Sequence, residues 1–180
     1  MAHIHGKKVM LREYRESDYE HIRSWVNNPE IVGTLSDIFL YPHSETQTRQ
    51  FMEMTMSPDW TGFVIARAHT EEYVGQIDFV KLDQKNGWGE IGIVIGKEDN
   101  HGKGYGSEAL ELLLAFAFNQ LRLNRVELLC WSFNQKGRRA YEKVGFVLEG
   151  VRRKKRYRNG EYHDELCFGL LKEEWEARTS

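Results

Sequence analysis

A glycine-rich segment, Asn100 to Gly106, is the part of the sequence best suited to chemistry. It reads Asn-His-Gly-Lys-Gly-Tyr-Gly and lies between a strand-like run and a long apolar helix pattern. Glycine at 102, 104 and 106 removes the Cβ atoms that would keep an anion from the backbone, and the helix start that follows attracts negative charge. The segment therefore predicts a phosphate-binding loop, with a glycine-rich turn that binds nothing as the alternative.

The same loop also matches the dinucleotide fingerprint G-x-G-x-x-[GA] from Gly104 to Ala109, with Glu127 at the spacing of the ribose-binding carboxylate. The context disfavours this match, because residues 97–101 separate the loop from its strand and antiparallel strands precede it. A P-loop is excluded because no G-K-[ST] ends the segment. A dinucleotide oxidoreductase is kept as a third reading.

The elements that must position the loop follow from the hydrophobic pattern. Ser17 to Glu20 has the form of a capping box, Asn86-Gly87 and Asn159-Gly160 predict hairpin turns, and Gly145 predicts a helix C-cap. The predicted strands are 8–14, 62–68, 73–82, 89–96, 125–132, 151–158 and 162–171, and the predicted helices are 17–26, 44–56, 107–121 and 135–144. This order predicts an α/β fold of the mixed α+β kind: a central mixed, mostly antiparallel sheet with helices on both faces.

Length and composition limit the class of protein. With 180 residues, 41% of them hydrophobic, the chain is predicted to form a single domain, 1–180, with its own core. The longest apolar run, 112–118, is too short for a membrane span, and the N-terminus lacks the apolar stretch of a signal peptide, so we expect a cytoplasmic protein with no membrane partner. Cys130 and Cys167 form no CxxC pair, and His3-Ile-His5 is a lone H-x-H, so we expect no metal.

Three segments together resemble the GNAT superfamily of N-acetyltransferases. They are the strand run Glu90-Ile-Gly-Ile-Val-Ile, the loop His101-Gly-Lys-Gly-Tyr-Gly, and Asn134 followed by Tyr141-Glu-Lys-Val-Gly-Phe. The family has a Q/R-x-x-G-x-[GA] acyl-CoA loop and an N-x-x-[AS]-x-x-x-Y-x-x-x-G-F segment. In this sequence His101 stands where the family has Gln or Arg.

The two ends of the chain resemble one branch of that superfamily. Leu11-Arg12 with Ser17-Asp18 and Trp25, and the ending from Asn159 to Trp175, are similar to the ribosomal-protein N-terminal and spermidine N-acetyltransferases. The resemblance implies acetyl-CoA as co-substrate and a primary amine as acceptor, either a protein N-terminus, such as that of a ribosomal protein, or a small amine. Polyamine acetylation is the main alternative. A non-catalytic acyl-CoA-binding sensor or interaction module is the alternative from another class, and the intact Asn134 and Tyr141 argue against it.

The resemblance also implies roles for particular residues. The pantetheine is expected to pair with Ile93, Val94 and Ile95, where two parallel strands splay to hold acetyl-CoA, and Tyr141 is the expected general acid. A phenol has an ordinary pKa of about 10, so at neutral pH it holds a proton that it can give to a departing thiolate. The residues expected near the pyrophosphate are His101, Gly102, Lys103, Gly104, Tyr105, Gly106 and Ser107. Asn134 is also expected to bind the cofactor, and Lys136, Arg138 and Arg139, which follow it closely, are the expected contacts of the CoA 3′-phosphate.

The general base is open between two carboxylates. Glu90 and Asp78 lie inside otherwise apolar strand runs, where burial is costly unless they face a cleft. Either could accept a proton through water or hold a cationic amine, and a solvated strand face is the alternative for both. Cys130 has no His near it in sequence, so we expect direct transfer in a ternary complex rather than through an acyl-enzyme.

The charge is unevenly distributed beneath a net value of −2. Residues 136–158 carry ten Lys and Arg against two Glu. The run from Arg152 to Arg158 has three interpretations: a solvated hairpin, a contact with CoA phosphates or a partner chain, or a contact with RNA or the ribosome. The overall balance disfavours a nucleic-acid partner, and a homodimer is compatible with the sequence.

Overall fold

The structure is a computed structural model that describes residues 3–180. Its helices and strands in chain order are β1 (Ile4–His5), β2 (Val9–Arg12), α1 (Tyr19–Val26), α2 (Pro29–Val32), α3 (Glu45–Thr55), β3 (Gly62–Arg67), β4 (Tyr73–Asp83), β5 (Trp88–Ile95), α4 (Tyr105–Asn119), β6 (Arg125–Trp131), α5 (Gln135–Val144), β7 (Val147–Arg158), β8 (Glu161–Leu171) and α6 (Lys172–Thr179). Short 3-10 turns lie at Glu16–Asp18, Asp37–Phe39 and Glu98–Asn100.

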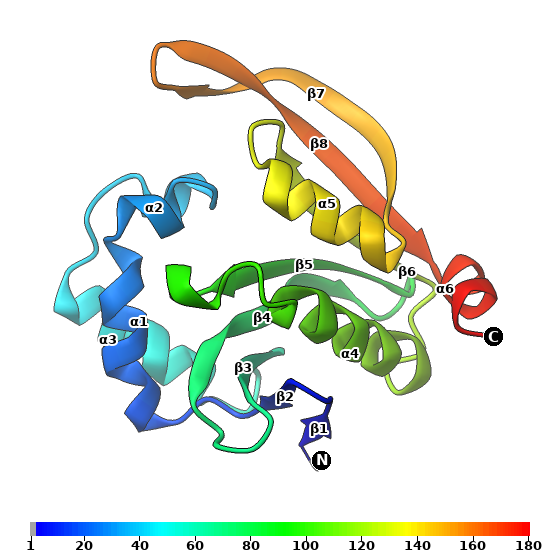
Figure 1. Cartoon of the computed structure of the whole chain (residues 1–180), viewed down its shortest axis with the longest axis horizontal. Coiled ribbons are helices and arrows are strands. Elements are labelled where there is room, and N and C mark those ends of the chain that lie inside the picture. Colours follow the sequence, from blue (N-terminus) through cyan, green and yellow to red (C-terminus); the bar gives the residue numbers. More distant parts are fainter. Residues whose placement is uncertain (1–2) are drawn as a thin grey trace. The chain divides into compact units, whose positions relative to one another are not determined.

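The strands form one eight-stranded sheet in the order β1-β2-β3-β4-β5-β6-β8-β7 (Figure 1). The pairs β1–β2, β2–β3, β3–β4, β6–β8 and β7–β8 are antiparallel. β5 and β6 are parallel, with Trp88–Glu90 in register with Arg125–Glu127. The prediction of a mixed, mostly antiparallel sheet containing a parallel pair is therefore confirmed.

The chain divides into two compact units. The N-terminal unit runs through Asp78 and adds Ile93–Leu112, and the C-terminal unit contains Phe79–Gly92 and Leu113–Ser180. The expectation of a single domain over 1–180 stays a prediction.

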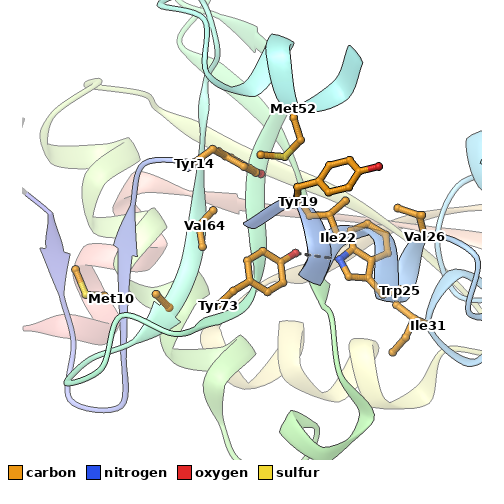
Figure 2. Packing of buried hydrophobic residues seen from close by; sticks show 11 residues of the cluster. Met10, Tyr14, Tyr19, Ile22, Trp25, Val26, Ile31, Met52, Val64 and Tyr73 are labelled. Carbon is orange, nitrogen blue, oxygen red and sulfur yellow. Dashed lines mark hydrogen bonds between the residues drawn. The ribbon is translucent and has the colours of Figure 1, made fainter. Parts of the chain in front are cut away.

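The core of the N-terminal unit forms where α1, α2 and α3 pack on β2, β3 and β4 (Figure 2). The predicted helical spacing in α1 is confirmed, because Ile22 and Trp25 are fully buried and Tyr19 and Val26 nearly so. Trp25 also donates a hydrogen bond from its indole Nε1 to the hydroxyl of Tyr73, at 3.0 Å. Burial of these large side chains stabilises the helix more than its own propensity does.

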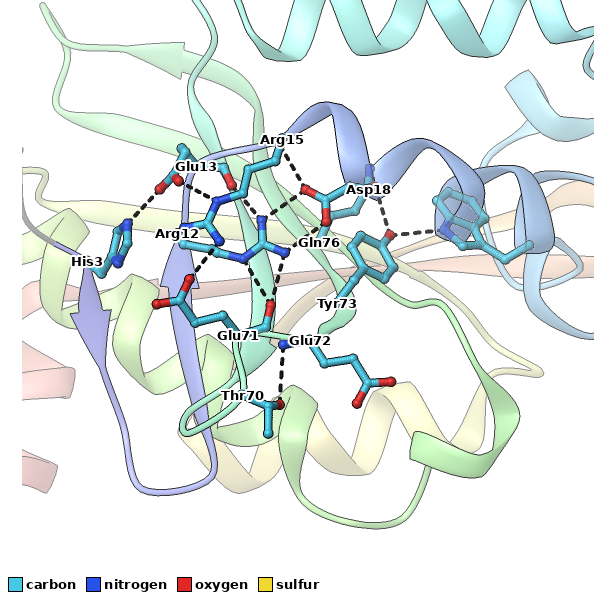
Figure 3. A network of polar contacts seen from close by, with 11 residues as sticks. His3, Arg12, Glu13, Arg15, Asp18, Thr70, Glu71, Glu72, Tyr73 and Gln76 are labelled. Atoms are coloured by element: carbon cyan, nitrogen blue, oxygen red, sulfur yellow. Dashed lines mark hydrogen bonds and ion pairs between the residues drawn. The ribbon is translucent and has the colours of Figure 1, made fainter.

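The capping box expected at Ser17 is wrong. The chain first makes the 3-10 turn Glu16–Asp18, and α1 begins at Tyr19. The carboxylate of Asp18 accepts the backbone N–H of Arg15 at 2.8 Å and both terminal nitrogens of Arg12, at 2.8 and 2.9 Å (Figure 3). Asp18 and Arg12 are almost fully buried. A bidentate charged pair is stronger than a neutral cap, so it determines the local geometry.

Five further elements differ from the sequence prediction. Neither β1 nor α6 was expected, and the short helix α2 lies where no helix was expected. β7 begins at Val147 rather than 151, and α4 begins at Tyr105 rather than 107. The ring of Trp175 in α6 packs 5.3 Å from that of Phe118, which explains why a charged terminal segment forms a helix. No helix in the described part of the chain is long and apolar enough to cross a membrane.

Candidate functional site

The glycine-rich loop has the backbone that its sequence predicts. Gly102 and Gly104 have φ of 73° and 80°, values that L-residues rarely adopt. Helix α4 begins at Tyr105, so the N–H groups of Tyr105, Gly106 and Ser107 have no partner one helical turn earlier within the helix. The first bond back to the loop runs from the N–H of Glu108 to the carbonyl of Gly104, at 3.1 Å. Such a helix start suits an anion.

The loop is anchored on the first turn of α4 and on the segment before β2. The carboxylate of Glu108 accepts three backbone N–H groups, from Lys7 at 3.0 Å and from Lys8 and Val9 at 2.8 Å each. These hydrogen bonds keep the pKa of Glu108 below its ordinary value, against the effect of burial. Lys8 Nζ donates to the carbonyl of Lys103 at 3.0 Å. The loop is thereby held without any ligand.

His101 is already engaged with the end of β5. Its Nε2 lies 3.1 Å from the carbonyl oxygen of Ile95, and its backbone N–H donates to the carbonyl of Glu98 at 2.9 Å. This arrangement differs from the expected contact with a cofactor, because both groups serve the loop itself. His101 stays a predicted cofactor neighbour through its position alone.

The end of β5 presents the expected apolar segment. Ile93, Val94 and Ile95 are partly exposed, although they belong to a strand inside the sheet order. β5 pairs with β6 over residues 88–90, so Ile93, Val94 and Ile95 lie beyond the part of β5 that pairs with β6. A Cβ added at Gly106 would meet the side chains of Ile93 and Ile95 at 3.8 to 3.9 Å. The side chains at this end of β5 therefore lie next to the start of α4.

Asp78 on β4 lies in an aromatic environment. Its Oδ1 accepts hydrogen bonds from the hydroxyl of Tyr14 at 2.7 Å and from the indole Nε1 of Trp60 at 3.1 Å. Gln76 Nε2 lies 3.4 Å from Oδ2. The rings of Tyr14, Phe51 and Trp60 pack edge to face, with centroids 5.7 to 6.3 Å apart. All these partners are neutral.

Burial raises the pKa of Asp78 from 3.8 to about 7, and the hydrogen bonds from Tyr14, Trp60 and Gln76 oppose that rise. A carboxylate with this pKa exchanges protons readily near neutral pH, which is what a general base requires. Part of the residue is exposed to solvent. Its position depends on Gly62, directly opposite on β3, since a Cβ there would collide with Oδ1.

Glu90, the second candidate base, forms an ion pair. Its Oε2 lies 3.3 Å from Nζ of Lys81, and its side chain is 14% exposed. Glu90 is therefore already engaged with a cation, whereas the partners of Asp78 are neutral. Both carboxylates stay candidates for the base.

Tyr141 on α5 is enclosed by aromatic rings of the C-terminal unit. Its ring lies 6.3 Å from that of Phe146 and 6.1 Å from that of Phe168. Burial raises the pKa of the phenol above its ordinary value, and the nearby Cys130 adds to this shift. The group therefore stays protonated throughout the neutral range, as a proton donor must.

Cys130 is a buried thiol. Burial raises its pKa to about 11, and its Sγ lies 3.5 Å from the carbonyl of Trp131 and 3.7 Å from that of Asn134. A thiol with this pKa is a poor nucleophile at neutral pH. This environment agrees with the expectation of direct transfer.

The residues expected near the CoA phosphates differ in their engagement. Asn134 is the N-cap of α5: its Oδ1 accepts the N–H of Gly137 at 3.0 Å. Arg138 pairs with Glu142 at 2.8 Å along the helix. Lys136 and Arg139 are exposed. Lys136 and Arg139 therefore stay predicted phosphate contacts, whereas Arg138 would have to break its ion pair with Glu142 to bind a phosphate.

Several residues of the basic run in β7 contact β8 or the end of β6 and the residues after it. Arg152 pairs with the nearly buried Glu165 at 2.7 Å. The guanidinium groups of Arg156 and Arg158 lie over the rings of Trp131 and Phe133, at 4.8 and 4.4 Å from the ring centroids. These contacts favour the reading as a hairpin with a solvated surface.

Sequence reasoning missed the residues that surround Asp78 and the role of Glu108. Tyr14, Trp60 and Gln76 come from different elements, and no local pattern links them. Gln76 was the only available signal: it lies two positions before Asp78 on the same strand, and alternate residues of a strand share a face. Within residues 3–180, no group of three or more His, Cys, Asp or Glu side chains is arranged to hold a metal ion.

Residues 8–147 match the family model described as "Acetyltransferase (GNAT) domain". The chain is 38% identical over 180 residues to the "Putative ribosomal N-acetyltransferase YdaF" of Bacillus subtilis, with 96% of each chain covered. It is 24% identical over 187 residues to the spermidine N(1)-acetyltransferase of Escherichia coli K12, with 98% of this chain and 92% of that one covered.

A solved structure from Bacillus anthracis, described as an acetyltransferase of the GNAT family, has the same fold. Its TM-score to this chain is 0.83 at 25% identity, with 96% of this chain and 100% of that chain covered. Fold and sequence thus point to the same family.

Proposed function

This chain belongs to the GNAT acetyltransferase family and is an N-acetyltransferase, and from that premise we propose that its acceptor is the N-terminal amine of a protein, a ribosomal protein first. Acetyl-CoA is the donor that the family uses. The residues present fit it: the loop has two glycines with positive φ, and an added Cβ at Gly102 would meet nothing within 4 Å. A pyrophosphate could approach the N–H groups of Gly102 to Ser107 there.

The observation that carries the proposal is the environment of Asp78. An amine is protonated at neutral pH and must lose a proton before its nitrogen can attack a carbonyl. The Asp78 carboxylate, with its pKa of about 7, removes that proton directly or through a water molecule. The rings of Tyr14, Phe51 and Trp60 beside it favour a cation before the proton is lost.

The remaining steps use the other candidate residues. Acetyl-CoA supplies a thioester, whose C–S bond breaks as the new C–N bond forms. Backbone groups of Ile93 to Ile95 are assigned to bind the pantetheine as an added strand. Tyr141 donates its phenolic proton to the departing thiolate, a step that its raised pKa keeps available across the neutral range. The acylated nitrogen gives up its remaining extra proton, which restores the phenol and leaves a neutral amide. Cys130 takes no part, since its thiol stays protonated.

Two observations favour a protein N-terminus over a polyamine. The relative named as a ribosomal N-acetyltransferase is 38% identical, whereas the spermidine enzyme is 24% identical. A polyamine also carries several positive charges along its length and needs several carboxylates, while the groups that contact Asp78 are the neutral Tyr14, Trp60 and Gln76. A single carboxylate suits a single amine.

The test is a thiol-release assay with acetyl-CoA and a panel of acceptors. We expect turnover with peptides that carry free N-termini of ribosomal proteins, little with the same peptides blocked at the N-terminus, and loss of turnover in Asp78→Asn. Faster turnover with spermidine or spermine would replace the proposed acceptor by a polyamine. Binding of acetyl-CoA without thiol release from any amine would indicate a sensor rather than an enzyme.

A further inference from the structure

The N-terminal unit contains an open cavity of about 560 Å³. Its walls come from three segments: the residues before β2, the turn between β3 and β4, and the glycine-rich loop with the start of α4. The side chains that matter are those of Lys7, Lys8, Arg67, His69, Lys103 and Tyr105. Among the described residues that line it, none is Asp or Glu.

One wall of the cavity, the turn between β3 and β4, is held in place by the buried Arg12 side chain. The guanidinium group of Arg12 donates to the carbonyl of Glu71 at 3.2 and 3.3 Å, and Arg12 is itself fixed by Asp18 (Figure 3). Within the turn, the N–H of Glu71 donates to the carbonyl of Arg67 at 2.9 Å. The turn thus keeps its shape without a ligand, which lowers the cost of ordering a site on binding.

A second wall is fixed by backbone contacts that leave its charged side chains at the surface. Lys7 and Lys8 bind the Glu108 carboxylate through their N–H groups, and both residues are exposed. Glu108 is therefore satisfied by the backbone. Lys8 Nζ bridges to the carbonyl of Lys103, so one ammonium group reaches from this wall to the loop.

Arg67 is held at the edge of the cavity by three neighbours. Its guanidinium lies over the ring of Tyr105, 5.8 Å from the centroid, and its Nη2 lies 3.4 Å from Oδ1 of Asn100. Glu72 is its ion-pair partner at 3.2 Å from Nε. Nε itself is buried, and Glu72 is its partner, so the terminal nitrogens of Arg67 are the part of the group that can face a ligand.

We propose that this cavity binds the phosphate group of a nucleotide-sized ligand, as an anion site separate from the backbone of the glycine-rich loop. Lys7, Arg67 and Lys103 supply positive charge to a phosphomonoester, and Tyr105 offers a ring face to a base or sugar. Clustered cations repel one another, and a dianion relieves that repulsion. The volume lies within the range of small-ligand sites.

Two ligands carry this chemistry. One is the 3′-phosphate end of CoA. In that case the inference rests on the proposed function, and the cavity binds the 3′-phosphate in place of Lys136, Arg138 and Arg139. The other is a free nucleotide that binds beside the donor. The chemistry of recognition is the same, so the experiment must separate the sources.

The experiment is calorimetric titration of the full chain with CoA and with dephospho-CoA, which lacks only the 3′-phosphate. The test variant is Lys7→Gln/Lys103→Gln. The matched control is Lys85→Gln/Lys155→Gln, which makes the same charge change at exposed positions elsewhere. The rival site is tested by Lys136→Gln/Arg139→Gln. A separate arm adds adenosine 3′,5′-bisphosphate to protein saturated with dephospho-CoA.

For CoA as the source, we expect the wild type and the control to bind CoA at least about tenfold more tightly than dephospho-CoA, and the test variant to lose that preference. For a free nucleotide, the bisphosphate binds dephospho-CoA-saturated wild type and not the test variant. The inference is overturned if the test variant matches the control in every arm, or if only the rival variant loses the preference. Failure of both CoA forms to bind would instead count against the proposed function, and the bisphosphate arm would still decide the cavity.

Discussion

Replacing Tyr14 by Phe tests the assignment of Asp78 most directly, because it removes one hydrogen bond and leaves the aromatic ring. The Tyr14 hydroxyl donates to Oδ1 of Asp78 at 2.7 Å, and this bond lowers the pKa of the carboxyl group against the effect of burial. The variant should therefore have a higher Asp78 pKa than the wild-type value of about 7.

The size of the shift follows from the strength of that bond. A hydrogen bond to a charged acceptor contributes about 1.5 to 3 kcal/mol. At 1.36 kcal/mol per pKa unit, its loss raises the pKa of Asp78 by about one to two units. If Asp78 is the base, its ionised fraction at pH 7 then falls from about one half to about one tenth or less, and the rate at that pH falls about fivefold or more.

The assay is the pH dependence of kcat/KM by thiol release between pH 5.5 and 10, with Tyr162→Phe on the exposed hairpin as the control. We expect the midpoint of the rising limb to lie near pH 7 in the wild type and the control, and about one to two units higher in Tyr14→Phe, with the rate restored at high pH. A midpoint that stays in place or moves down, or a loss of rate that is equal at all pH values, would refute the assignment.

Four further predictions concern the surroundings of Asp78, the Glu108 carboxylate and the Cys130 thiol. Gly62→Ala should displace the Asp78 carboxylate and lower kcat/KM on the order of 100-fold, whereas Gly150→Ala, with open space around its Cβ, should leave it unchanged. The pKa of Asp78 is raised from 3.8 to about 7 in the folded state, so its contribution to the free energy of unfolding is full below pH 4 and is lost as the pH rises through 7. Asn has no such pH dependence. In urea unfolding, the free energy of unfolding of Asp78→Asn should therefore rise relative to that of the wild type by up to about 4 kcal/mol between pH 4 and 8. Glu108→Gln should lower the free energy of unfolding by about 1 to 2 kcal/mol, because the amide is a weaker acceptor for three N–H groups. Cys130→Ala should retain turnover, and its loss with an intact thermal melt would revive an acyl-enzyme.

Local signals in the sequence were sufficient for most of the fold. Asn159-Gly160 predicts a hairpin, and both residues have positive φ in the structure, as a two-residue turn of that kind requires. Gly145 has φ of 110° at the end of α5, as a C-cap glycine should. These predictions succeed because backbone torsions and the period of apolar residues are set over a few neighbouring positions.

The candidate site is a different matter. The sequence by itself determined the backbone of the glycine-rich loop and the helix start after it, because positive φ and a helix start are local properties. Only the tertiary structure distinguishes the surroundings of Asp78 and Glu90, since the first receives hydrogen bonds from Tyr14 and Trp60, far away in sequence, and the second pairs with Lys81. The pKa of a carboxylate depends on desolvation and on the groups brought beside it, and folding alone brings those groups together.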